Sequence, residues 1–302
     1  MFEYGKIGGF FMDQRLFIFK LKHLRGIGNK GLLKIFHYFL NHPEEEFCIE
    51  TCLSLGCIKK NYQEAFIVSF QQAERITEND FHYFLESYSF LTIMDEDYPD
   101  RLREIYNPPI ALFYLGNKEW FQHDHTLAMI GSRESTPFGK QMIESLVPSF
   151  CQQDVTIVSG LAKGNDTFSH QSAIRHQGKT IAVIGCGLNT FYPKENQRLQ
   201  QFIAKEHLLV SEYIPNTKPL RHHFPSRNRI IAGLSKGTCV IESKRKSGTF
   251  ITAQLALEEG RDVFAVPGNP FTDASEGCLS LIQAGAKCIW KAEDILEEWQ
   301  AQ

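Results

Sequence analysis

The chain has 302 residues, enough to bury a full hydrophobic core and to hold one large domain with a smaller one. Hydrophobic residues make up 43% and charged residues 22%, which is the composition of an ordinary soluble globular protein. No apolar run approaches the roughly 18 residues that a membrane span needs, and the N-terminus lacks the pattern of a secretory signal. We therefore expect a cytoplasmic protein with no membrane association.

The eight cysteines are scattered, mostly within apolar segments, and none forms a CxxC pair. In a reducing compartment such cysteines are expected to be small buried hydrophobes. A metal site made from Cys48, Cys52 and Cys57 with His37 and His42 is the alternative, but this spacing fits no regular zinc-binding pattern. The sequence therefore predicts no metal site.

The net charge of -3 hides an uneven distribution. Between Gly131 and Pro270 there are 17 Lys and Arg against 11 Asp and Glu, a balance of +6, which leaves 15 against 24 in the remainder. Positive charge is thus concentrated in the middle of the chain, which permits an anionic ligand without requiring one.

The N-terminal third is predicted to be helical. Residues 1–11 precede a second methionine, Met12, and are expected to be an extension or disordered. Residues 12–87 form a small helical domain whose first two helices are separated at Gly26-Ile27-Gly28. This break is either a structural turn or a helix-hairpin-helix element in which glycine amides approach a phosphate, and we favour the turn.

A change of pattern places the domain boundary before Asp97-Tyr98-Pro99, so residues 88–302 form the second domain. In it, short Val- and Ile-rich runs alternate with helical patterns, which is typical of a Rossmann-like, doubly wound, mostly parallel sheet. The expected strands are residues 126–130, 156–158, 180–184, 208–210, 238–242 and 262–266, and helices are expected to begin at Pro137, Asp166, Glu195 and Ser275.

Glycine-bearing turns follow several of these strands, and ligands bind at the carboxyl ends of strands in such sheets. Exposed amides and helix N-termini at this edge favour an anion such as phosphate. The basic segment from Phe224 to Thr249 adds two further helix starts around one strand. The predicted phosphate-binding residues are Gly131, Ser132, Arg133, Ser159, Gly160, Lys163, Lys194, Arg227, Asn228, Arg229, Lys244, Ser247, Gly248 and Thr249.

Structural alternatives exist for the basic residues. Arg227 or Arg229 could instead pair with Glu212 or Glu242, and the run beginning at Lys244 could be a solvated loop. A single glycine at a strand-to-helix turn more often serves the backbone conformation of the turn than the binding of a ligand. The convergence of several such residues on one edge of the sheet favours a binding site.

Cofactor and catalytic motifs are incomplete. The segment beginning at Gly185 has the first two glycines of GxGxxG but lacks the third, and the GxxxxGK[ST] phosphate loop is absent, so no cofactor is predicted. Asp166 and His170 share a helix face near Ser159, but Ser159 lies outside a GxSxG elbow. We therefore predict no catalytic residues.

Ordered motifs from Asp95 onward carry a family resemblance. The segments GSRESTPFGK, IVSGLAKGNDTFSHQSAI, GKTIAVIGCGLNTFYPKEN, HHFPSRNRIIAGLS and SGTFITAQLALEEGRDVFAVPGN closely resemble the DNA-processing protein A (DprA or Smf) family. The resemblance implies an extended Rossmann domain preceded by a SAM-like or helix-hairpin-helix domain. It further implies a non-enzymatic, homodimeric single-stranded DNA-binding protein of natural transformation, which protects incoming strands and loads the RecA recombinase.

The resemblance also assigns site residues. The Gly-Ser-Arg turn of the family falls on Gly131, Ser132 and Arg133, the lysine of its YPK element on Lys194, and its Arg-Asn-Arg segment on residues 227–229. The chain departs from the family pattern at Asn165 and at Leu279, and neither departure is expected to touch the phosphate site directly. The winged-helix domain of some members is expected to be absent.

An enzyme is the alternative function. A nucleotide-processing Rossmann protein of the phosphoribohydrolase kind would also use an acid and a glycine-rich phosphate loop. Its PGGxGT motif is represented here only by fragments around Gly268 and Gly248, so single-stranded DNA binding is preferred.

Overall fold

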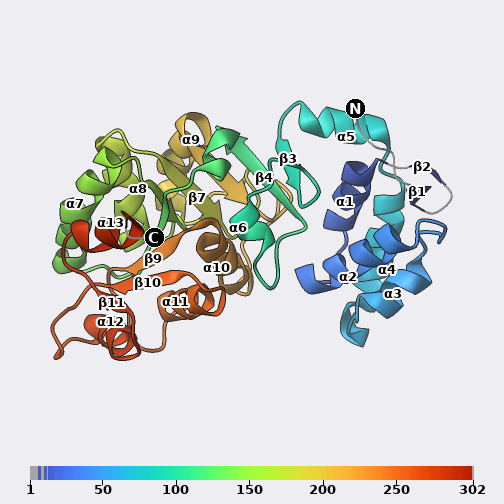
Figure 1. Cartoon of the computed structure of the whole chain (residues 1–302). Helices are drawn as coiled ribbons and strands as arrows, with labels where there is room; N and C mark the ends of the chain where they lie inside the picture. The colour runs from blue at the N-terminus through green and yellow to red at the C-terminus, as the bar shows by residue number, and fades with distance from the viewer. Residues whose placement is uncertain (1–5, 8–9, 12, 301–302) are drawn as a thin grey trace. The chain divides into compact units, whose positions relative to one another are not determined.

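The computed structural model describes residues 6–7, 10–11 and 13–300, and these fall into two compact units (Figure 1). The first unit holds residues up to Glu96 together with Asn107–Phe113, and the second holds Asp97–Tyr106 and residues from Tyr114 onward. The polypeptide therefore passes between the units three times. The domain boundary expected near residue 87 stays a prediction.

Most of the expected N-terminal extension lies outside the described residues. Its described part is β1 (Lys6–Ile7) and β2 (Phe10–Phe11), which pair antiparallel. The rest of the first unit is helical and ends in one strand. Its elements are α1 (Gln14–Lys22), α2 (Asn29–Asn41), α3 (Ile49–Leu55), α4 (Lys60–Glu74), α5 (Glu78–Leu85) and β3 (Ser89–Thr92).

Phenylalanines dominate the core of the first unit. Phe17, Phe39 and Phe70 are at most 2% exposed, and the rings of Phe17 and Phe39 meet edge to face with centroids 6.0 Å apart. Such pairs stabilise a core beyond the area they bury. The α5 helix begins at a capping box, in which Thr77 and Asp80 each satisfy a backbone amide of the other.

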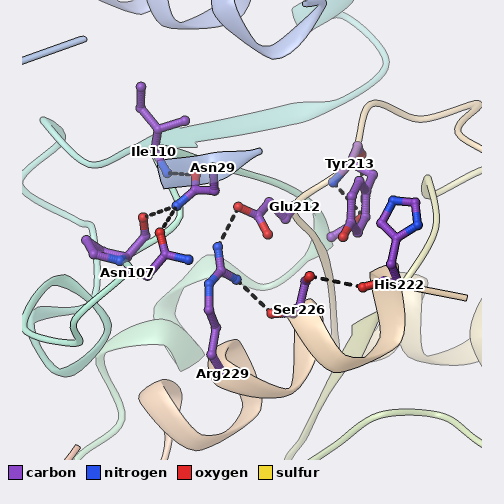
Figure 2. Close-up of polar contacts among 10 residues, drawn as sticks. Asn29, Asn107, Ile110, Glu212, Tyr213, His222, Ser226 and Arg229 are labelled. Atoms are coloured by element: carbon purple, nitrogen blue, oxygen red, sulfur yellow. Dashed lines mark hydrogen bonds and ion pairs between the residues drawn. The ribbon is translucent and has the colours of Figure 1, made fainter. Parts of the chain in front are cut away.

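The break between α1 and α2 packs closely against α4. Gly26 has φ +75°, and a Cβ atom there would lie 2.8 Å from the carbonyl oxygen of Tyr62. Glycine is therefore needed at this turn both for its backbone conformation and for its packing. At the start of α2, the Asn29 side chain donates to Asn107 at 2.8 Å and accepts from the Ile110 amide at 3.2 Å (Figure 2).

The second unit alternates strands and helices. Its strands are β5 (Thr126–Ile130), β6 (Thr156–Ser159), β7 (Thr180–Ile184), β8 (Leu208–Ser211), β9 (Gly237–Val240), β10 (Asp262–Ala265) and β11 (Lys287–Cys288). Its helices are α6 (Asp100–Arg103), α7 (Pro137–Gln152), α8 (Asn165–Arg175), α9 (Gln197–Glu206), α10 (His223–Leu234), α11 (Gly248–Glu258), α12 (Asp273–Gln283) and α13 (Glu293–Gln300), with 3-10 turns at Lys118–Gln122 and Lys194–Asn196.

The sheet has the order β11-β10-β9-β5-β6-β7-β8-β4-β3, where β4 spans Ala111–Gly116. All the neighbouring strands from β11 through β8 pair in parallel. Helices α7 to α9 lie on one face of this part of the sheet and α10 to α12 on the other (Figure 1). The predicted α/β fold with a mostly parallel, doubly wound, Rossmann-like sheet is confirmed.

The core of the second unit forms where α7 and α13 cover β5, β9 and β10. Leu127, Ile143, Phe150 and Phe264 are at most 1% exposed there, and Trp299 of α13 closes the cluster. Burial was expected for the cysteines in general, and it is confirmed for Cys52, Cys186, Cys239 and Cys278, where it raises the pKa of the thiols. The expectation is wrong for Cys57, which is exposed, and Cys48, Cys151 and Cys288 are only half-buried. No helix in the described part of the chain is long and apolar enough to span a bilayer.

Candidate functional site

A pocket of about 60 Å³ opens at the carboxyl ends of β5, β6 and β7. Parallel strands place the loops that follow them on one edge of the sheet, which is why these three loops meet. The lining residues are Arg133, Gly160, Ala162, Lys163, Gly185, Tyr192, Pro193, Phe224 and Arg227. Four of the residues singled out from the sequence, Arg133, Gly160, Lys163 and Arg227, therefore lie together.

The rim of the pocket carries exposed cations beside aromatic rings. Arg133 and Lys163 are both exposed. The Arg133 guanidinium lies 5.4 Å from the centroid of the Phe224 ring, and that ring lies 5.2 Å from Tyr192 at a tilt of 41°. Tyr192 is 43% exposed, so one ring of the pair is available to a ligand. A positive charge beside a partly open aromatic surface suits a phosphate with an attached base.

Arg227 forms the floor of the pocket. Its side chain is 4% exposed, and Nη1 donates to the carbonyl oxygen of Gly160 at 2.6 Å and to that of Val183. Burial lowers the pKa of Arg227 to about 10, and the nearby Asp166 carboxylate opposes this shift. A Cβ atom on residue 160 would lie 2.4 Å from the Arg227 guanidinium, so the floor requires glycine there.

Two exposed lysines beside the site have acidic partners. Lys163 Nζ lies 2.5 Å from Glu195 Oε1, and Lys244 Nζ lies 3.7 Å from Glu134 Oε2. Lys194 is exposed and begins the 3-10 turn Lys194–Asn196, next to the pocket residue Pro193. These pairs are solvated and exchange readily, so a phosphate can compete with the carboxylates for the lysines.

Arg229 occupies a different environment from that expected. Its Nη2 lies 2.7 Å from Glu212 Oε1, its Nη1 donates to the carbonyl oxygen of Ser226 at 3.0 Å, and it is 7% exposed (Figure 2). The structural alternative, pairing with Glu212, is therefore present. Residues 227–229 lie inside α10, which begins at His223, and not at its free N-terminal amides.

Several other predicted residues join loops to one another. The Ser159 hydroxyl is buried and donates to the Met129 carbonyl oxygen at 2.6 Å. The Thr249 hydroxyl donates to the Gly131 carbonyl oxygen at 3.0 Å, and Ser247 caps α11 by accepting from the Phe250 amide. Asn228 likewise donates to the carbonyl oxygen of Gly248 at 3.4 Å, whereas the Ser132 hydroxyl accepts from the Glu134 amide at 3.1 Å within its own loop.

Asn165 and Glu242 hold the loop that follows β5, and the sequence did not reveal this. A Cβ atom on Gly131 would lie 2.2 Å from Asn165 Nδ2, and that same Nδ2 donates to Glu242 at 3.1 Å. The expectation that the departure at Asn165 leaves the phosphate site untouched is therefore wrong. An acidic residue two positions after a buried strand, at the binding edge, was the signal available for Glu242.

The catalytic alternative gains no geometric support. His170 Nδ1 lies 2.7 Å from the Thr180 hydroxyl, and burial lowers the pKa of His170 to about 3. Burial raises the pKa of Asp166, whose carboxylate accepts from the Ala162 amide at 3.3 Å. The Ser159 hydroxyl donates to the Met129 carbonyl oxygen and also contacts Asp166, so the serine meets the acid and not the histidine. The three side chains are therefore not arranged as nucleophile, base and orienting acid.

Comparisons with known proteins agree with this architecture. The sequence model of the family described as DNA recombination-mediator protein A matches residues 89–300. The DNA processing protein DprA of Streptococcus pneumoniae is 42% identical over 283 residues, covering 94% of this chain and 97% of that protein. DprA of Bacillus subtilis is 47% identical over 208 residues, covering 69% of this chain and 70% of that protein.

Solved structures give the same result. The X-ray structure of S. pneumoniae DprA aligns with a TM-score of 0.82 at 41% identity, covering 94% of this chain and 97% of that one. Helicobacter pylori DprA, whose structure is described as showing a unique single-stranded DNA binding mode, aligns with a TM-score of 0.63 at 27% identity, covering 71% of this chain and 96% of that one.

The fold and pocket thus define a doubly wound α/β protein with a cationic, partly aromatic site at the carboxyl ends of its strands. The chain belongs to the DNA recombination-mediator protein A (DprA/Smf) family.

Proposed function

We propose that this protein binds single-stranded DNA through the pocket at the ends of β5, β6 and β7, without regard to sequence. The observation that carries the proposal is the convergence of exposed Arg133 and Lys163, buried Arg227 and the Tyr192–Phe224 pair in one pocket. The H. pylori relative described as binding single-stranded DNA supports this ligand.

The proposed contacts divide the predicted residues into two groups. Arg133, Lys163 and Lys194 neutralise successive phosphates at the rim, and amides near Gly131 and Gly160 hold phosphate oxygens. Arg227 supplies positive charge at the floor of the pocket and Lys244 is an exposed cation beside it, whereas Ser159, Thr249 and Arg229 bond to the protein itself and fix the loops. A base then rests against Tyr192, the exposed ring of the pair.

The proposal extends to partners and to chemistry. The protein acts without catalysis, as a homodimer that delivers single strands to the RecA recombinase. A candidate contact surface is α11, where Ile251 is 45% and Leu257 49% exposed. Large apolar side chains left open on a helix favour coverage by a partner.

Fluorescence anisotropy with labelled single strands tests the DNA site. Arg133→Ala is expected to weaken binding and to make the log-log dependence of affinity on salt shallower by about 0.7 for each phosphate that the variant no longer neutralises. The matched control is Arg175→Ala, because Arg175 is exposed, pairs with Glu144 at 2.7 Å, and lies at the opposite end of α8 from the pocket. Equal affinity in wild type and Arg133→Ala would remove this site.

Recombinase delivery needs a separate assay. RecA is added to single-stranded DNA coated with a single-strand-binding protein, with and without this protein, and filament formation is followed. We expect acceleration by wild type and little by Arg133→Ala. Incubation with nucleoside monophosphates tests the enzymatic alternative, and release of free base would contradict a non-catalytic role.

A further inference from the structure

The strand order has its topological switch point between β5 and β9. From β5 the chain proceeds outward through β6, β7 and β8, whereas β9, β10 and β11 lie on the other side of β5. In doubly wound folds the crevice at the switch point receives the ligand, and the helix after the first strand points its N-terminus at a phosphate. Here that helix is α7, yet the pocket extends from the loop after β5 toward β6 and β7, away from β9.

A carboxylate of the protein itself fills the switch point. Glu242 follows β9 and is 3% exposed. Its oxygens accept from the Thr136 amide at 3.1 Å, from the Thr136 hydroxyl at 2.5 Å and from Asn165 Nδ2 at 3.1 Å, and the Ser135 hydroxyl lies 3.2 Å away. Amide, hydroxyl and carboxamide donors of this kind are the ones that a phosphate group would use.

The carboxylate also lies against the first turn of α7. Thr136 is the N-cap of that helix, and a Cβ atom on Gly139 would lie 2.0 Å from Glu242 Oε2. The N-terminus of a 16-residue helix attracts an anion through its free amides and its dipole. The Glu242 carboxylate supplies that anion from within the protein. It fills the space beside the first turn of α7, and its negative charge repels a second anion.

We propose that Glu242 is a specificity-determining residue: it occupies the phosphate position of the fold and so excludes nucleotides from the switch point. Ligand phosphate is thereby confined to the neighbouring pocket of Arg133 and Lys163. The exclusion follows from the occupied switch point alone and does not depend on whether that pocket binds single-stranded DNA.

The test removes the internal anion and offers an external one. In Glu242→Ala, the donors of Thr136, Ser135 and Asn165 are vacated, and titration calorimetry with inorganic phosphate and with AMP is expected to show binding at least about tenfold tighter than in wild type. Phosphate should also raise the melting temperature of Glu242→Ala relative to chloride at equal ionic strength, and by more than it raises that of wild type, in which only the pocket of Arg133 and Lys163 is open to phosphate.

Two variants separate the possible causes. Glu242→Gln keeps the volume of the side chain but removes its negative charge. If occupation of the switch point is what excludes phosphate, this variant should gain no affinity for phosphate. Arg133→Ala should lose single-strand affinity without gaining phosphate affinity at the switch point, so a failure of the proposed DNA site is distinguishable from a failure of this inference. A folded Glu242→Ala that binds phosphate no better than wild type would overturn the proposal.

Wild type provides a test that does not depend on the folding of a variant. In NMR spectra, the Thr136 amide should stay unshifted as inorganic phosphate is added, because Glu242 already holds it. A saturable shift of that amide would contradict an occupied switch point. Should Glu242→Ala fail to fold in chloride, refolding by phosphate supports the proposal, and otherwise the Thr136 titration decides.

Discussion

Arg229 and Glu212 form a buried ion pair: 2.7 Å separates Nη2 from Oε1, and the two side chains are 9% and 5% exposed (Figure 2). A charge at this depth depends on its partner, because removing one member leaves the other desolvated and unpaired. The pair joins α10 to the residue that follows β8 and so contributes to the frame around the pocket.

Arg229→Ala is expected to lower the free energy of unfolding by about 3–5 kcal/mol, measured by urea denaturation. The folded fraction should retain near wild-type affinity for single strands. The double variant Arg229→Met with Glu212→Leu should recover much of the stability, because no charge is then left unpaired. If Arg229→Ala instead kept full stability and lost affinity for DNA, Arg229 would be assigned a direct contact with phosphate.

Glu195→Gln is expected to strengthen single-strand binding about two- to fivefold at low salt, because Lys163 is released from an exposed pair. The effect should fade as salt is raised, since solvated charges are screened. Glu206→Gln is the matched control: Glu206 is also exposed and pairs with a lysine, Lys205, at 2.8 Å, but at the C-terminal end of α9. Equal gains in both variants would point to net charge instead of Lys163.

Tyr192→Ala is expected to weaken binding by about 1–3 kcal/mol for the base that stacks there. Tyr192→Phe should retain most of the affinity, because the ring does the stacking. A strand carrying an abasic site at the matching position should bind wild type and Tyr192→Ala alike. Tyr106→Ala, at a tyrosine that is 81% exposed and lines no part of the pocket, controls for the loss of a surface ring.

Acid should destabilise the protein through His170. Burial, then His207 and Arg227, lowers the folded-state pKa of His170 from 6.5 to about 3, so the native state holds a neutral ring while the unfolded chain binds a proton below pH 6.5. Its contribution is therefore complete above pH 6.5 and is lost as the pH falls toward 3. Between pH 6.5 and 5 the loss amounts to about 2 kcal/mol.

Urea denaturation at both pH values measures this loss. His170→Gln should show a shallower dependence on pH than wild type, whereas His82→Gln, at an exposed histidine, should follow wild type. The pKa of His207 is also lowered by burial and acts in the same direction, so some dependence will persist in His170→Gln. Identical slopes in wild type and His170→Gln would contradict the buried neutral ring.

The repeating pattern made the parallel strands predictable. The strands at Thr126–Ile130 and Thr180–Ile184 and the start of α7 at Pro137 have the expected bounds. A short apolar run bounded by turn residues is too short for a buried helix, so it indicates a buried strand and also marks where the strand ends. The strand near Cys239 lies at Gly237–Val240, although it was expected at 238–242, because Glu242 turns away to meet Thr136.

The identity of the pocket residues was predictable only in part. Their position at strand ends follows from topology, so Arg133, Gly160 and Lys163 could be placed on one edge. Burial of long side chains does not follow from local sequence, because Arg229 is paired by Glu212 from another strand. The same holds for Asn165, whose contact with Gly131 depends on the approach of two loops from different strands.

Arg227 gives the pocket a positive charge that does not move. Nη1 is held by the carbonyl oxygens of Gly160 and Val183, so the position of this charge is fixed by the protein itself. The charges at the rim, by contrast, belong to the exposed, solvated side chains of Arg133 and Lys163. A polyanion in the proposed site would therefore meet a fixed attraction from below, while its contacts with the two solvated side chains at the rim would form and break one at a time.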